Sequence, residues 1–121
     1  MQYVFLEYSI DCAHWLPKVP VDHKCHRMHG HRYEIRLEIQ GAPDATGWII
    51  DYADIKEIAD PIIMGLDHRV LNDIEGLENP TCENLVGYLR HELSMLWLSS
   101  IEVRETDRAG SGWRKEEKTN G

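Results

Sequence analysis

The chain has 121 residues, a length that suits one domain with a single core. Its hydrophobic content of 42% and charged content of 28% are those of an ordinary globular protein and exclude a disordered or fibrous one. The 13 basic and 21 acidic residues give a net charge of -8 without a basic cluster, so we expect no nucleic-acid partner.

The N-terminal segment has no basic stretch followed by a long apolar run, and no apolar stretch in the chain is long enough to span a bilayer. The three cysteines, Cys12, Cys25 and Cys82, lack redox or metal-finger spacing and suit free thiols in a reducing compartment. We therefore expect a cytoplasmic protein without a membrane partner. Residues 1–113 should form one domain, and residues 114–121 a polar tail.

Two β-strands are predicted in the first third of the chain. Apolar residues alternate with more polar ones at Val4, Leu6, Tyr8, Ile10 and Cys12, and again at Tyr33, Ile35, Leu37 and Ile39. If these strands pair antiparallel, the end of the first lies beside the start of the second, with residues 15–28 as a loop over that end.

Two helices and two more strands complete the pattern. Apolar residues recur at helical spacing between Asp51, the expected N-cap, and Leu66, with Pro61 as an expected kink. The same spacing runs from Thr81 to Leu98 and includes Trp97 on its apolar face. Beyond it, Ile101, Val103 and Glu105 alternate with polar residues as a third strand, and a short fourth strand is expected at Trp113 after Gly112.

The order strand, strand, helix, helix, strand, strand predicts an α+β fold, with an antiparallel sheet and both helices on one face. Four strands cannot close a barrel, and apolar side chains are also expected on the other face of the sheet. We therefore expect neighbouring subunits to complete the sheet in a homo-oligomer.

Five of the seven histidines lie between residues 14 and 31. His14 continues the apolar phase of the first strand, and His29 and His31 share the phase of the second. In an antiparallel pair these three imidazoles converge, which predicts a divalent metal site, most consistent with zinc, that keeps a fourth position for water or substrate. The alternative is that they are exposed, or bonded to carbonyl groups in the core. His23 and His26 have no such phase and are interpreted as loop residues.

Three further features bear carboxyl, thiol or imidazole groups suited to acid–base chemistry. Cys25 lies among basic neighbours, which favour a thiolate, and is the best candidate for a base or nucleophile. Asp67 directly precedes His68 and can orient its ring, although such a pair after a helix is also ordinary surface. Glu105 points a carboxylate along an apolar face, so it needs a partner, either a nearby arginine or a ligand with two adjacent N–H donors.

The motif CHRMHGH over residues 25–31, with His14 upstream, resembles the 6-pyruvoyltetrahydropterin and 6-carboxytetrahydropterin synthase family over nearly the whole chain. Further matching pieces are the segments 47–52, 66–68, 71–73, 76–81 and 105–106. The three residues between Cys25 and His29 are similar to the bacterial carboxy branch, because the pyruvoyl branch has a longer gap. A third branch, which makes a hydroxymethyl pterin, carries a glutamate near the position of Cys25.

This resemblance implies the tunnelling fold, in which trimers close a barrel and two barrels stack into a hexamer. It implies that His14, His29 and His31 bind Zn²⁺, that Cys25, Asp67 and His68 move protons, and that Glu105 anchors the pterin. The expected enzyme is a lyase of queuosine biosynthesis, which converts 7,8-dihydroneopterin triphosphate to 6-carboxy-5,6,7,8-tetrahydropterin and releases acetaldehyde and triphosphate. The alternatives are a 6-pyruvoyltetrahydropterin synthase and a non-catalytic metal- or pterin-binding module.

Overall fold

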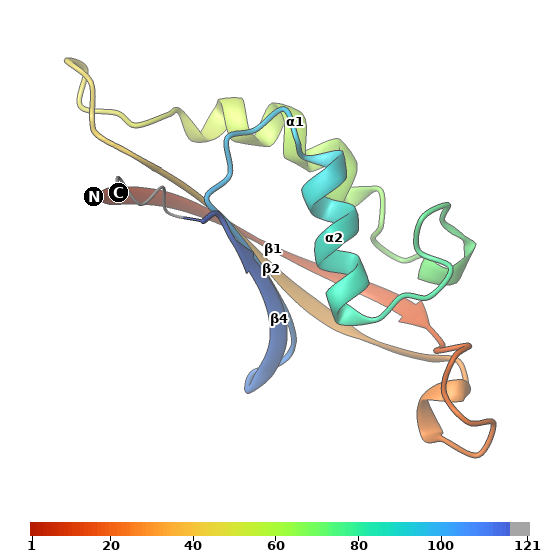
Figure 1. The fold of residues 1–121 in the computed structure, drawn as a ribbon. Helices are drawn as coiled ribbons and strands as arrows, with labels where there is room; N and C mark the ends of the chain where they lie inside the picture. The colour runs from red at the N-terminus through yellow and green to blue at the C-terminus, as the bar shows by residue number, and fades with distance from the viewer. Residues whose placement is uncertain (117–121) are drawn as a thin grey trace.

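The computed structural model describes residues 1–116 and has the predicted order of elements (Figure 1). The strands are β1 (Gln2–His14), β2 (His29–Gly41), β3 (Ser100–Thr106) and β4 (Ala109–Arg114), and the helices are α1 (Tyr52–Met64) and α2 (Cys82–Glu92). Two 3₁₀ turns, Lys24–His26 and Leu71–Asp73, lie in the connecting loops. Arg114, expected in the tail, ends β4, and residues 117–121 of that tail lie outside the described residues.

The four strands form one antiparallel sheet in the order β1-β2-β3-β4. The β1–β2 register is continuous from Gln2 opposite Gly41 to His14 opposite His29, so the end of β1 meets the start of β2 as predicted. The long loop of residues 15–28 lies beyond that end of the sheet (Figure 1). Because side chains alternate between faces, this register carries the histidine phase of both strands to one face.

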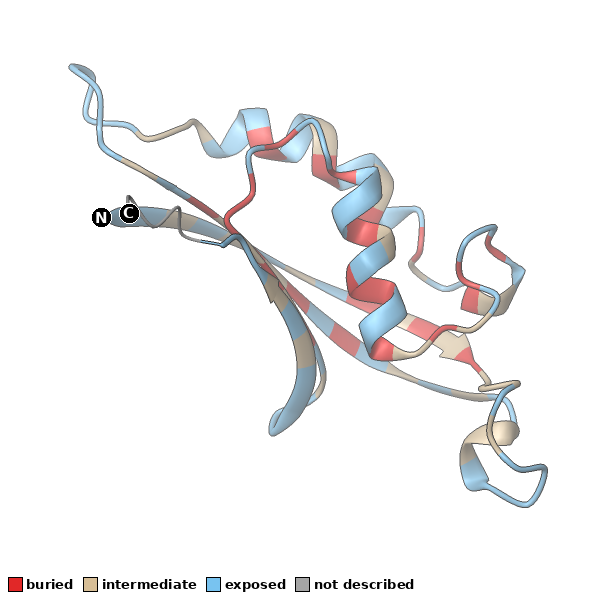
Figure 2. Ribbon diagram, in the orientation of Figure 1, coloured by how far each residue is buried: buried red, intermediate tan, exposed pale blue. Residues whose placement is uncertain are grey.

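Both helices lie on one face of the sheet, and the buried residues gather between the two layers (Figure 2). Asp51 is the N-cap of α1, as predicted, and its carboxylate accepts the N–H of Ala53 at 2.9 Å. Thr81 caps α2 by accepting the N–H of Asn84 at 3.1 Å. Pro61 is accommodated inside α1, which continues to Met64.

The second helix is shorter than its apolar spacing predicts. It ends at Glu92 rather than Leu98, and turns take over, with the Leu96 N–H donating to the Leu93 carbonyl at 2.9 Å. Leu93, Leu96 and Leu98 are still buried, so their spacing reflects core contact without a helix. The helical spacing predicted that Trp97 lies on the apolar face, but Trp97 is 80% exposed because the helix ends before it.

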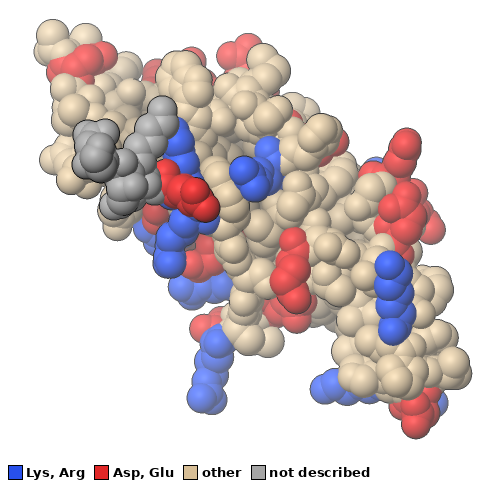
Figure 3. Space-filling view, in the orientation of Figure 1, with Lys and Arg blue, Asp and Glu red and all other residues tan. Residues whose placement is uncertain are grey.

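The face of the sheet away from the helices carries apolar side chains, as expected, together with charged ones. Its exposed large apolar residues on β1 are Tyr3 and Phe5, and the Arg36 guanidinium lies 4.0 Å from the centre of the Phe5 ring. Arg36 also pairs with Glu7 at 3.6 Å and with Glu38 at 3.0 Å. Acidic and basic side chains are likewise interspersed over the surface seen in Figure 3.

Candidate functional site

The three predicted metal ligands converge at the end of the sheet. The Nε2 atom of His14 lies 3.0 Å from that of His29 and 3.3 Å from that of His31. His14 is buried at 3% exposure, while His29 and His31 are half-buried. This convergence follows from the register, because His14 ends β1 directly opposite His29, and His31 lies one residue pair further along the same face.

Each ring is held by its other nitrogen, which lies near a backbone carbonyl. The Nδ1 atoms of His14, His29 and His31 lie 3.0, 2.8 and 3.3 Å from the carbonyl oxygens of Pro80, Arg27 and Arg32. A carbonyl accepts only from a protonated nitrogen, so in the neutral form of each ring the proton lies on Nδ1 and Nε2 keeps its lone pair. Neutral imidazole is the form that binds metals.

This donor set fits a tetrahedral divalent ion. Three Nε2 lone pairs that face one another repel, and a cation between them removes that repulsion. In a zinc shell with Zn–N distances of about 2.0–2.1 Å, neighbouring nitrogens are about 3.3 Å apart, close to the separations seen here. Burial also lowers the pKa of His14 to about 4, which keeps this ligand neutral. His14, His29 and His31 can therefore hold a metal ion.

Tyr33 is a partner of this cluster that the sequence did not reveal. It is fully buried, its hydroxyl lies 2.9 Å from Nδ1 of His14, and its ring centre is 4.2 Å from that of His31. Its place two residues after His31, on the same face, was the available signal, but the alternation assigned it only to the core. Tyr33 packs one ligand and hydrogen-bonds another.

Asp67 and His68 form a close pair on the loop after α1. Nδ1 of His68 lies 2.8 Å from the Asp67 carboxylate, whose other oxygen accepts the N–H of Asp11 on β1 at 2.8 Å. The Asp11 N–H and then His68 lower the pKa of Asp67, so this carboxylate is ionised at neutral pH. His68 has a φ of 60°, a strained conformation for a residue other than glycine, and its amide donates to the Asp11 carbonyl at 2.6 Å.

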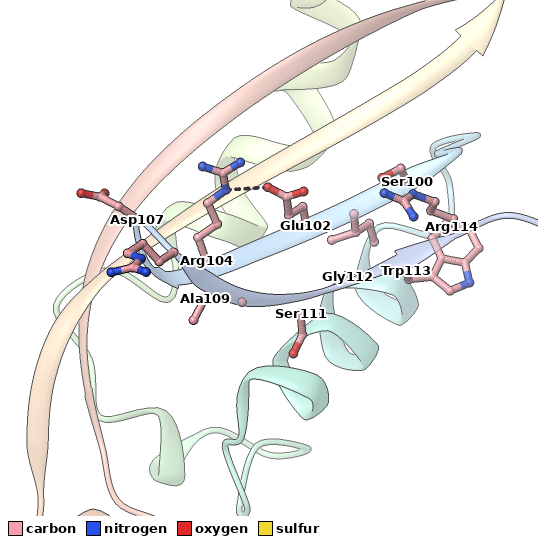
Figure 4. A pocket seen from close by; sticks show the side chains of 12 residues that line it. Ser100, Glu102, Arg104, Asp107, Ala109, Ser111, Gly112, Trp113 and Arg114 are labelled. Atoms are coloured by element: carbon pink, nitrogen blue, oxygen red, sulfur yellow. Dashed lines mark hydrogen bonds and ion pairs between the residues drawn. The ribbon is translucent and has the colours of Figure 1, made fainter.

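His31 of the histidine cluster and His68 of the Asp67–His68 pair border the same surface hollow. This hollow, of about 440 Å³, is lined by Asp11, Gly30, His31 and His68 among others. A second hollow, of about 520 Å³, lies along β3 and β4 and carries none of the predicted site residues (Figure 4). In this second hollow Arg104 and Glu102 pair with each other at 2.7 Å, and the first hollow, which holds two of the predicted residues, is the candidate site.

Cys25 is half-buried in the 3₁₀ turn beyond the end of the sheet. Its N–H donates to Nδ1 of His23 at 3.0 Å, and its carbonyl accepts the N–H of Leu16 at 2.8 Å. Within residues 1–116, no hydrogen bond joins its thiol to the histidine cluster or to Asp67 and His68. The structure thus fixes the backbone of Cys25 near the end of β1, and within residues 1–116 its thiol forms no hydrogen bond to the other candidates.

Glu105 lies on β3 at a break in the pairing with β4. Arg104 pairs with Gly110 and Thr106 with Ala109, so Glu105 falls in a bulge and is half-buried. Burial and, next, the negative charge of Glu105 raise the pKa of Tyr33. The predicted carboxylate therefore lies near the tyrosine that contacts His14, with no arginine paired to it in the described part of the chain.

Comparisons with known proteins agree on one family. Residues 3–116 match the sequence profile of 6-pyruvoyl tetrahydropterin synthase. The 6-carboxy-5,6,7,8-tetrahydropterin synthase of Synechocystis is 34% identical over 115 residues, covering 88% of each chain. The dihydroneopterin monophosphate aldolase of Pyrococcus furiosus is 31% identical over 91 residues, covering 75% of this chain and 66% of that one.

The fold comparison gives the same result. The structure of Caenorhabditis elegans 6-pyruvoyl tetrahydropterin synthase superposes with a TM-score of 0.81 at 26% identity, covering 96% of this chain and 98% of that one. The predicted subunit of a tunnelling fold is thereby confirmed. Neither helix in the described residues has the length and hydropathy to cross a membrane.

Proposed function

The chain belongs to the 6-pyruvoyl tetrahydropterin synthase family, whose members are enzymes of pterin chemistry, and from this membership we propose that it is a zinc-dependent 6-carboxytetrahydropterin synthase. Its substrate would be 7,8-dihydroneopterin triphosphate, and its product would serve 7-deazapurine synthesis, such as that of queuosine, in the cytoplasm. The observation that carries the proposal is the single hollow bordered by a metal-ligand histidine, His31, and by the oriented His68.

The proposed reaction balances without an external oxidant or reductant. 7,8-Dihydroneopterin triphosphate and water give 6-carboxy-5,6,7,8-tetrahydropterin, acetaldehyde and triphosphate. The ring gains two hydrogens as the side-chain carbon attached to it is oxidised to the carboxyl level, and two side-chain carbons leave as acetaldehyde. Such an internal redox shift needs proton transfers at carbon and oxygen, which positioned side chains catalyse by about 10²–10⁴-fold.

The metal and three side chains divide the remaining work. A zinc ion held by His14, His29 and His31 would acidify the side-chain hydroxyl groups and polarise the forming carbonyl. Cys25 acts as a base that removes a proton from the substrate side chain. His68, oriented by Asp67, passes protons on the opposite side of the substrate.

Glu105 binds the pterin ring. Its two carboxylate oxygens match the adjacent N–H donors of an aminopyrimidine ring, and a half-buried carboxylate that has no arginine partner within residues 1–116 gains from that contact. Tyr33, between Glu105 and His14, would keep the pterin pocket and the metal ligands in fixed relation.

Two observations favour the carboxy product. Three residues separate Cys25 from His29, the short spacing of the carboxy branch. The Synechocystis relative, which covers most of the chain, is named for that product. The nearest alternative is a 6-pyruvoyltetrahydropterin synthase, in keeping with the name of the C. elegans structure. A non-catalytic metal- or pterin-binding module would keep the histidines without needing Cys25, Asp67, His68 and Glu105 together.

The test is product analysis by mass spectrometry, after incubating zinc-loaded protein with 7,8-dihydroneopterin triphosphate. We expect 6-carboxy-5,6,7,8-tetrahydropterin together with acetaldehyde. A 6-pyruvoyl product would instead assign the chain to the alternative enzyme. Unchanged substrate, with protein that is folded and metal-loaded, would contradict a synthase and favour the binding module.

A further inference from the structure

One residue of the family-like segments has no role in the proposed chemistry but makes an unusual set of contacts. Asn72 lies in the 3₁₀ turn Leu71–Asp73, which the fully buried Leu71 anchors in the core. The Oδ1 of Asn72 accepts the N–H of Trp15 at 3.0 Å, and its Nδ2 donates to the carbonyl of the same residue at 2.8 Å. Nδ2 also lies 3.4 Å from the carbonyl of Glu78.

Trp15, the residue that Asn72 holds, lies between His14 and Leu16, whose amide contacts the loop that bears Cys25. Trp15 comes after His14, the last residue of β1. The next amide, that of Leu16, donates to the carbonyl of Cys25 at 2.8 Å. The Trp15 ring packs edge-on against the ring of His26, with centres 5.6 Å apart. Trp15 and the adjacent Leu16 thus both contact the turn that bears Cys25.

The connection between α1 and α2, which contains Asn72, also contacts His14 at the end of β1. The Pro80 carbonyl, near the start of α2, lies 3.0 Å from Nδ1 of His14. Asn72 and Pro80 thus hold two consecutive residues, Trp15 and His14, at the point where β1 gives way to the loop. We propose that Asn72 is a positioning residue that fixes the Cys25 loop against the metal-binding end of β1.

The side-chain amide is suited to this task because it offers a donor and an acceptor at once. Aspartate has nearly the same shape, but it would accept from the Trp15 N–H and set a negative charge against the Trp15 carbonyl. Alanine would leave both backbone groups without this partner. The role of Asn72 in turnover rests on the proposed function, because it acts through Cys25 as a base. The position of the Cys25 loop can be measured without any reaction.

The test compares the wild type with Asn72→Asp, Asn72→Ala and the control Asn84→Ala. Asn84 makes a similar bond, from its Nδ2 to the Asn79 carbonyl at 2.8 Å, but has no link to Trp15. Alkylation of Cys25 by iodoacetamide is followed by peptide mass spectrometry, since Cys12 and Cys82 are buried. Zinc content, kcat and KM are measured on the same samples.

In both Asn72 variants we expect the alkylation rate of Cys25 to change by at least about threefold. We also expect kcat to fall roughly tenfold or more, with KM within about twofold and the zinc content unchanged. Asn84→Ala should match the wild type in all four. The proposal would be overturned if Asn72→Asp kept the wild-type alkylation rate of Cys25 and the wild-type kcat. It would also be overturned if Asn84→Ala changed these two quantities as much as the Asn72 variants do. If the wild type converts no pterin, the proposed reaction is wrong, and the alkylation rates alone then decide the role of Asn72.

Discussion

At the scale of single residues, backbone carbonyls set the tautomer of the three clustered histidines when their rings are neutral. Each of the three histidine rings has its Nδ1 beside a carbonyl oxygen, so each Nε2 lone pair points into the cluster. Exposed imidazoles gain a proton as the pH falls through about 6.5, but His14 is buried with a pKa of about 4. The cluster is therefore organised for a cation before any ion arrives.

The depressed pKa of His14 makes the metal-free protein acid-sensitive. As the pH falls below about 6.5, His14 takes up a proton in the unfolded chain but not in the folded one, until about pH 4. We expect the free energy of unfolding to drop by on the order of 1–2 kcal/mol between pH 7 and pH 5. Urea titrations at the two pH values measure it. His14→Asn should reduce this drop, and an equal drop in that variant would assign it to other groups.

Removal of one ligand should abolish tight metal binding. His29→Ala deletes the Nε2 that lies 3.0 Å from His14, and we expect the zinc affinity to fall more than about 100-fold, measured by competition with a chelator. The exposed His91 on α2 provides the control His91→Ala, which should bind zinc as the wild type does. A fully loaded His29→Ala variant would contradict the ligand set.

A substitution of Cys25 can test the proposed metal binding and the proposed turnover separately. Cys25→Ala should keep its zinc, because Cys25 is not among the three converging ligands, and should lose about 10²–10⁴ in kcat if it acts as the base. Cys82→Ala removes a buried thiol at the start of α2 and should retain turnover. Wild-type kcat in Cys25→Ala would rule out its role in proton transfer.

At the scale of elements, the start of α2 supports the histidine cluster. Thr81 caps the helix, and the carbonyl of the preceding Pro80 holds His14. We expect Thr81→Ala to cost about 1 kcal/mol of unfolding free energy and to weaken zinc binding as well. Asp51→Ala removes the matching cap of α1 and should cost similar stability without changing zinc affinity. Chemical denaturation and chelator competition on both variants test this, and unaltered zinc affinity in Thr81→Ala would contradict the link.

The elements also show what the sequence can and cannot predict. Alternation alone predicts the strands and, through their antiparallel pairing, the convergence of His14, His29 and His31. The contacts that Pro80 and Asn72 make with the end of β1 could not be predicted, because a hydrogen bond between distant segments produces no periodic pattern in the sequence. The end of α2 at Glu92 was missed for a related reason, since buried leucines after it keep a helical spacing within turns.

At the scale of the molecule, β1 and β4 are the edge strands of the sheet formed by residues 1–116. Some backbone amides of β1 point away from β2, toward the outer edge of the sheet. Among them, the Asp11 N–H donates to the Asp67 carboxylate and the Ala13 N–H donates to the Arg69 carbonyl. By the period of two, the amides of Phe5, Glu7 and Ser9 point to the same edge, while β2 occupies the other side of β1. An edge with free donors is a site for pairing with another strand.

If neighbouring subunits close the barrel by pairing with the outer edge of β1, removal of a single backbone amide on that edge should weaken oligomer formation. Glu7→Pro removes one outward N–H and leaves the β1–β2 bonds intact, because proline is tolerated on an edge strand. Glu7→Ala loses the same side chain and its contact to Arg36 but keeps the amide. By sedimentation velocity, we expect the wild type and Glu7→Ala to sediment as trimers or hexamers of the 14.1 kDa chain, and Glu7→Pro to shift towards the monomer. A Glu7→Pro variant that assembles like the wild type would show that this edge does not carry the contact, and a monomeric wild type would contradict the barrel itself.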